Sequence, residues 1–229
     1  MKITPSGIAG ITLLGPECAE FNAALTPLMG RAPRDLLAPA LPYSVIVLNG
    51  SGRAISLLGV RFDMAGPHAK PYSVIHYADS LRNPEKSDFL PGTARFVCAE
   101  PSFTALVLGR DGELSSRGRN NLDNLRRVLG IGATLDCVAW DDGRFEGPDS
   151  FEAFGRLTRQ REMEAKFAAR VLIASPAEAE KLLIAAIDDP ENRALRALAI
   201  TLMEGMRTGG RAEMLARAGS HRLKIAVWR

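Results

Sequence analysis

The first part of the chain alternates short apolar runs with turn residues, and this pattern predicts strands. Apolar and polar positions alternate in the runs 54–63, 72–77 and 93–99. In the run 54–63, Val60 and Phe62 fall on one face, as in a strand that is covered on one side. With the other apolar runs between turn dipeptides, this pattern predicts roughly seven or eight short strands.

Three turn sequences predict β-hairpins, because asparagine and glycine tolerate the positive φ that tight connections need. They are Asn49-Gly50-Ser51-Gly52 between the runs 43–48 and 54–63, Asp111-Gly112 between Phe103–Leu108 and a weak return strand near Glu113, and Asp142-Gly143 between Leu135–Trp140 and Arg144-Phe145. Strands that are apolar on one face cannot close a core as a single sheet, so two sheets packed face to face are expected. We therefore predict an antiparallel, immunoglobulin-like β-sandwich over residues 1–148.

Two segments of this first part do not fit the strand pattern. Asn120–Leu129 has apolar residues at helical spacing and is followed by Gly130, which predicts a short helix crossing between strands. Prolines lie within and beside Arg31–Ala40, which predicts a loop or a single turn there.

After Gly147-Pro148 the pattern changes to a helical period, which predicts a helical segment over residues 149–229. Capping sequences mark three helix starts, namely Asp149 with Glu152, Ser175-Pro176 with Glu178, and Asp189-Pro190. The predicted class is therefore α+β, with three or four helices after the sandwich.

The ends of these helices follow from apolar spacing and glycine. The first predicted helix runs to about Ile173, and the third spans about Pro190–Arg207 before Gly209-Gly210. A short fourth helix is predicted over Arg211–Ala218. The last residues, Leu223–Trp228, alternate and fit either a terminal strand or a frayed tail.

The composition is that of an ordinary globular protein. The net charge is +3, and the part after Asp149 holds 14 Lys and Arg residues against 10 Asp and Glu residues. So small an excess does not predict attraction to nucleic acid or to a membrane surface. No apolar run approaches the ~20 residues that span a bilayer, so no membrane span is predicted. The Gly7–Leu14 patch makes a poor signal peptide because proline and polar residues flank it, and the compartment stays open.

Cys18, Cys98 and Cys137 are too few for a disulfide-rich scaffold, and none lies in a C-x-x-C pair typical of a zinc site. Cys98 and Cys137 fall in predicted strands, so two buried free thiols are expected, with one bridge between the sheets as the alternative. No cofactor and no metal is predicted.

Four acidic residues, Asp141, Asp142, Glu146 and Asp149, lie within nine residues and invite a calcium interpretation. Their spacing does not supply the carboxylate, glycine and glutamate positions of an EF-hand loop. The structural interpretation is that Asp142 forms the hairpin turn and Asp149 caps a helix.

The first functional hypothesis is a non-enzymatic interaction or assembly module that binds a protein partner or another copy of itself. The first C-terminal helix has an apolar stripe that is interrupted around Arg159–Arg161, so a partner would complete its burial. The candidate partner-binding residues are Phe151, Phe154, Leu157 and Phe167.

The second hypothesis is a hydrolase with a site at the junction of sandwich and helices, and it depends on His76. Asp79 and Ser80 follow this strand histidine closely, and Asp136 lies in another predicted strand. These residue types suit a Ser/His/Asp arrangement, but no G-x-S-x-G sequence supports it. The competing interpretation is a strand histidine whose hydrogen bond is structural.

The third hypothesis is an anion or nucleic-acid binder. Its candidate residues are Arg110, Arg117, Arg119, Arg126 and Arg127. No aromatic residue is interleaved for base stacking, so nucleic acid is not the expected partner.

The segment Leu135–Asp149 and the charged, phenylalanine-bearing helix after it resemble a group of uncharacterised bacterial proteins. In these, an immunoglobulin-like β-domain runs into a helical tail through a segment like LDxVxxxDGxFxGPD. The Asn49-x-Ser-Gly turn, Ile55–Phe62 and Leu90-Pro91-Gly92 resemble the first half of the same family. The resemblance covers about Tyr43–Phe167 and implies the fold. It implies no activity, cofactor or catalytic residue, and it suggests export, for which this N-terminus shows no signal.

Overall fold

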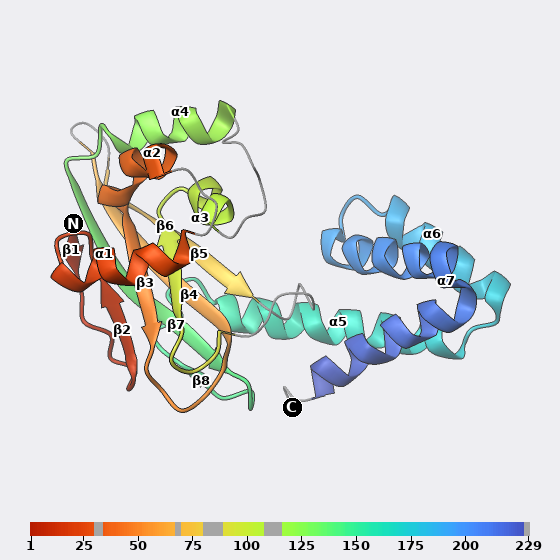
Figure 1. Cartoon of the computed structure of the whole chain (residues 1–229). Coiled ribbons are helices and arrows are strands. Elements are labelled where there is room, and N and C mark those ends of the chain that lie inside the picture. The colour runs from red at the N-terminus through yellow and green to blue at the C-terminus, as the bar shows by residue number, and fades with distance from the viewer. Residues whose placement is uncertain (30–33, 67–69, 80–88, 108–115, 227–229) are drawn as a thin grey trace. The chain divides into compact units, whose positions relative to one another are not determined.

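A computed structural model describes residues 1–29, 34–66, 70–79, 89–107 and 116–226 (Figure 1). The chain divides into two compact units, Met1–Pro148 and Asp149–Arg229. The first unit combines two sheets with several helices, and the second is helical. The fold is therefore mixed α+β, as the sequence pattern predicts.

The larger sheet of the first unit has five strands. In sheet order they are β1 (Lys2–Ile3), β7 (Gly130–Trp140), β4 (Ile55–Ala65) and β5 (Tyr72–Asp79), with β8 (Phe145–Glu146) also paired to β7. All these pairs are antiparallel except β1 with β7. The pairing of β7 with β8 confirms the hairpin predicted at Asp142-Gly143.

The smaller sheet has three antiparallel strands in the order β2 (Ile11–Leu14), β3 (Ser44–Asn49) and β6 (Ala94–Cys98). The predicted hairpin at Asn49-Gly50 is wrong, because β3 and β4 belong to different sheets. The Asn49 side chain is buried at this crossing and donates hydrogen bonds to the carbonyls of Arg53 and Phe89, both at 2.9 Å. These side-chain hydrogen bonds thus hold together the segment in which the chain passes from one sheet to the other.

One apolar cluster contains side chains from both sheets. It includes Val60 and Phe62 of β4, Leu135 of β7, and Val45 and Val47 of β3, all nearly or fully inaccessible to solvent. These residues recur at every second position of their strands, because successive side chains of a strand point to opposite faces. The period of two in the sequence therefore marks the residues of this core.

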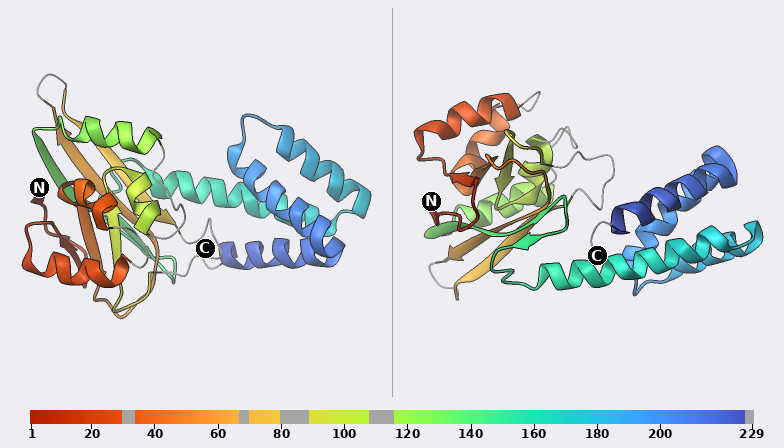
Figure 2. Two further views of the ribbon diagram at one scale, coloured as in Figure 1. Left: turned by 45° about the horizontal axis from the view of Figure 1, so that its top comes forward. Right: turned by 90° about the horizontal axis from the view of Figure 1, so that it is seen from below.

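The opposite face of the smaller sheet is also buried, since it packs against helices (Figure 2). The helical elements of the first unit are α1 (Ala19–Leu25), η1 (Thr26–Leu28), α2 (Arg34–Leu37), η2 (Ala38–Tyr43), α3 (Pro101–Val107) and α4 (Ser116–Leu125). Ile46 of β3 and Phe96 of β6 pack in this second cluster with Phe21, Leu37 and Phe103. Burial on both faces explains why β3 reads as a continuous apolar run.

The prediction of a strand over Phe103–Leu108 is wrong, because Pro101–Val107 form helix α3. Pro101 suits the first position of a helix, where no backbone N–H is needed. The return strand predicted near Glu113 lies outside the described residues. The helix predicted over Asn120–Leu129 is confirmed as α4, which begins at Ser116 and ends at Leu125.

The second unit contains α5 (Ala153–Ile173), α6 (Pro176–Asp188) and α7 (Arg193–Ala226). The capping box of Ser175 and Glu178 is confirmed. Gly210 has φ 66° and ψ −161°, so it breaks α7 where the Gly209-Gly210 pair predicts an end. The terminal-strand alternative is wrong for residues 223–226, which are helical, and 227–229 lie outside the described residues.

The predicted capping box at Asp149 is wrong, because α5 begins only at Ala153. Glu152 precedes the helix with φ 51° in the left-handed region and makes no side-chain cap. The Asp149 carboxylate instead accepts a hydrogen bond from the backbone N–H of Phe154 at 3.1 Å. Asp149 thus still satisfies an amide of the first helical turn, although it lies three positions before the N-cap residue Glu152.

Candidate functional site

His76 lies on β5 and is directed into the first unit. Its ring packs edge-on against the Phe62 ring, with centroids 5.7 Å apart and an interplanar angle of 74°. Its Nε2 atom lies 2.8 Å from the carbonyl oxygen of Ala99, to which it donates in the tautomer with the proton on Nε2. The histidine therefore ties β5 to the residue that follows β6.

Burial lowers the pKa of His76 below its ordinary value of 6.5. The hydrogen bond to Ala99 and the negative charge of Glu100 act in the opposite direction, but the loss of solvation outweighs both. The ring is therefore neutral at pH 7, and its partner is a backbone carbonyl. This environment favours the structural interpretation of His76.

We expect the first unit to lose stability below pH 6.5 through His76. The unfolded chain binds the proton near pH 6.5 and the folded chain only at lower pH, so the unfolded state holds more protons between the two values. Stability therefore falls as the pH drops from 6.5 towards the pKa of the folded state. The His76→Gln variant keeps a donor for the Ala99 carbonyl but does not titrate. Urea denaturation at pH 7 and pH 5 should show a smaller loss in this variant, and an equal loss in both proteins would contradict the lowered pKa.

Asp136 does not meet His76, although the hydrolase hypothesis pairs them. Asp136 lies on β7, which β4 separates from β5, and its carboxylate is 3.9 Å from the guanidinium of Arg61. Arg61 points to the face opposite its neighbour Phe62, so Asp136 and His76 lie on opposite faces of the sheet. The side chain of Asp79 and all of Ser80 lie outside the described residues.

Glu100 is a buried carboxylate that the sequence pattern does not single out. It accepts hydrogen bonds from the backbone N–H of Ser102 at 3.3 Å and from the Ser102 hydroxyl at 2.7 Å. It also accepts one from the Asn121 side chain at 2.8 Å. The Glu100 carboxylate thus caps α3 through Ser102 and fastens it to α4 through Asn121, so Glu100 has a structural role. The Glu-Pro-Ser sequence before an apolar run is the signal that predicts such a helix start.

The three cysteines are free, and Cys98 is completely buried in the second apolar cluster. Burial raises the pKa of the Cys98 thiol to about 11. The thiolate is therefore scarce at neutral pH, which argues against Cys98 as a nucleophile.

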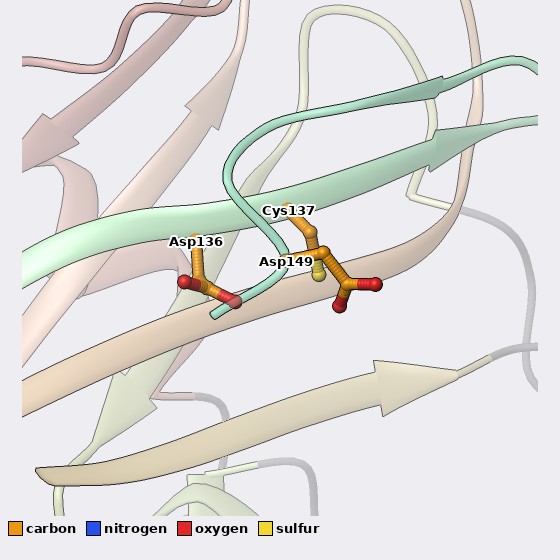
Figure 3. A group of neighbouring side chains, drawn as sticks. All are labelled: Asp136, Cys137 and Asp149. Carbon is orange, nitrogen blue, oxygen red and sulfur yellow. The ribbon is translucent and has the colours of Figure 1, made fainter. Parts of the chain in front are cut away.

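Asp136, Cys137 and Asp149 form a small group in which one oxygen or sulfur atom from each lies within 4.8 Å of the others (Figure 3). The chain returns to β7 at Gly147, where an added Cβ would lie 2.3 Å from the carbonyl oxygen of Asp136. The Asp136 carboxylate faces a guanidinium, and the Asp149 carboxylate accepts from a helix amide. Because both carboxylates have protein partners, we assign this group a structural role.

Two acidic residues of the β7–β8 hairpin, Asp142 and Glu146, also have protein partners. Asp142 pairs with Arg53 and Arg144, and Glu146 accepts a hydrogen bond from the indole N–H of Trp140 at 2.8 Å. The Arg53 guanidinium lies over the Trp140 ring, 4.6 Å from its centroid. These contacts support the structural interpretation of the acidic cluster.

The candidate anion-binding arginines are only partly described. Arg126 pairs with Asp123 at 3.0 Å, one turn before it, and Arg127 is exposed beyond the end of α4. Arg110 and the side chains of Arg117 and Arg119 lie outside the described residues. Of these five arginine side chains, the structure therefore describes only those of Arg126 and Arg127.

The candidate partner-binding residues differ in exposure. Phe151 is exposed and Phe154 is half-buried, whereas Phe167 lies in the core of the helical unit. The side chain of Leu157 lies outside the described residues. The apolar stripe of α5 thus includes Phe167, which is already buried within the helical unit and needs no partner to cover it.

The outer edge of β5 is the longest strand edge without a paired strand among the described residues of the first unit. β5 ends the larger sheet, and none of the described strands pairs with this edge (Figure 1). It has 8 residues, whereas the other edge strands β1, β2, β6 and β8 have 2, 4, 5 and 2. Tyr72 and Tyr77, near its ends, are 45% and 39% exposed. A free strand edge presents backbone donors and acceptors that can pair with another chain.

None of the helices in the described parts of the chain is long and apolar enough to cross a membrane. The described residues also form no reactive arrangement around His76, so the β5 edge stands as the candidate functional surface. The chain matches no protein-family model, no curated protein and no solved structure, so its function is inferred from its own residues.

Proposed function

We propose that this chain is a non-enzymatic interaction module that binds a protein chain by strand addition to the β5 edge. The observation that supports it is a strand of 8 residues at the end of a sheet, unpaired on its outer side by any described strand. An extended segment laid along this edge would satisfy its backbone donors and acceptors, and pockets for alternate side chains would give specificity. The exposed tyrosines near the two ends of β5 would add buried aromatic area on binding.

The frame that carries this edge is, in our proposal, an immunoglobulin-like sandwich. Two separate sheets contribute side chains to one apolar cluster, and that supports the proposal. The resemblance of Leu135–Asp149 to bacterial proteins with such a domain agrees with it. The helices that cover the second face of the smaller sheet are an addition to the plain two-sheet arrangement.

Site-directed photo-crosslinking in the cells that make the protein tests this function. A benzophenone side chain replaces Tyr72, an aromatic position on the β5 edge, and in a matched control it replaces Thr12, an exposed position on β2. We expect irradiation to link another protein chain to position 72, and little to position 12. Mass spectrometry of the adduct then identifies that chain.

Two results would contradict the proposed function. One is the absence of protein adducts at position 72 above the level at position 12. The other is adducts at both positions in equal yield, which would mean random collision and not binding at the β5 edge.

A further inference from the structure

We infer that the chain added to the β5 edge is the β5 strand of a second copy, antiparallel to the first about a twofold axis at Ile75. This inference rests on the proposed function, because it names the partner of the same edge. Three observations support it. The residues of β5 do little to block pairing at its edge, the two ends of the strand carry opposite charges, and this register pairs almost all of the residues of β5.

The sequence of β5 lacks several of the devices that normally block edge pairing. Proteins protect exposed strand edges with lysine, proline, bulges or very short strands. Between Tyr72 and Asp79 there is no lysine, proline or glycine. The strand also pairs with β4 residue by residue without a register shift, so no bulge turns its edge away.

The charges at the two ends of β5 have opposite sign. Lys70 is exposed just before the strand, and Asp79 is the last residue of the strand. Between them the only titratable side chains are two tyrosines and His76, and the lowered pKa of His76 leaves its ring neutral at pH 7. An antiparallel partner brings the basic end of one copy to the acidic end of the other, whereas a parallel partner would place like ends together. A twofold contact requires a self-complementary surface of this kind.

An axis at Ile75 uses almost the whole strand. Residues 72–78 are then paired, so that Ile75 faces Ile75 of the second copy and Ser73 faces Tyr77 of the second copy. Ser73, Ile75 and Tyr77 share one face of each copy, because their positions differ by two. The two sheets would join into one continuous sheet with matching faces, which a register shifted by one residue would not allow.

Light scattering during size-exclusion chromatography of the full-length protein tests the inference. We expect the wild type to move from monomer to dimer as its concentration rises through the micromolar range. Ser73→Lys places a charge on the exposed edge and should weaken the dimer by about tenfold or more. Thr12→Lys adds the same charge to exposed β2 and should leave the dimer unchanged.

A second variant tests the register. Ile75→Cys should form a disulfide-linked dimer under mild oxidation, because the two introduced cysteines would lie opposite each other. Circular dichroism confirms that each variant is folded before it is compared.

A wild type that stays monomeric throughout this range, or a dimer that Ser73→Lys leaves intact, would overturn the inference. The proposed function would survive either result if photo-crosslinking at position 72 captured a different protein. The proposed function would fall with the inference only if position 72 captured no protein chain above the level at position 12.

Discussion

Replacing Gly147 with alanine is expected to destabilise the first unit by about 3 kcal/mol or more. Gly147 has φ 119°, a conformation that alanine adopts only with strain. An added Cβ would also lie 2.3 Å from the carbonyl oxygen of Asp136 and 2.9 Å from the Cα of Cys137. Urea denaturation followed by the fluorescence of buried Trp140, in a Trp228→Phe background, measures the loss.

Gly92→Ala is the matched control for this variant. Gly92 also has a positive φ, of 72°, but no atom from elsewhere in the chain lies within 4 Å of its added Cβ. Its cost is expected to be that of the left-handed backbone alone, about 1–2 kcal/mol. If Gly147→Ala cost no more than Gly92→Ala, the close return of the chain to β7 would be wrong.

Replacing Phe62 with alanine should cost about 3–5 kcal/mol, because the side chain is completely buried in the cluster that joins both sheets. The variant also removes the ring against which His76 packs. Urea denaturation in the same Trp228→Phe background gives the change in the free energy of unfolding.

Leu90→Ala is the control for the Phe62 variant, because Leu90 is 49% exposed in the same unit. Its expected effect is within about 0.5 kcal/mol. A Phe62→Ala cost as small as that of Leu90→Ala would show that the two sheets do not share this core.

Local patterns predict much of the secondary structure correctly. The alternation that places Val60 and Phe62 on one face of β4 is a period that burial imposes on any strand covered on one side. Ser175 and Glu178 cap α6 as their spacing predicts, because this cap involves only residues three positions apart. The break in α7 at Gly210 is also a local effect, because it depends on the backbone conformation of that one residue.

The errors arise where the outcome depends on distant residues. Phe103–Leu108 has the residue types of a strand, but its first part becomes helix α3, which Glu100 caps and Asn121 holds from another helix. Asn49-Gly50 has the residues of a hairpin turn. The chain nevertheless changes sheet there, and Asn49 hydrogen-bonds to Phe89, 40 residues away.

The candidate functional surface also depends on distant residues, which local sequence patterns do not reveal. Alternation predicts a strand at Tyr72–Tyr77, but only the order of strands in the sheet shows that this strand is at an edge. Likewise, the partner of His76 is the backbone of Ala99, 23 residues away, so no side-chain motif could reveal it. Edge position and backbone partners are properties of the assembled sheet.

The central claim is that the β5 edge pairs with the same edge of a second copy, and amide hydrogen exchange of the strand tests it most directly. Exchange is followed by mass spectrometry at low and high concentration of the full-length protein, with the Ser73→Lys variant as control. The wild type should show slower exchange in peptides that cover residues 72–79 as concentration rises, while the variant should show no change. Equal exchange of these peptides at both wild-type concentrations would contradict pairing between copies at this edge.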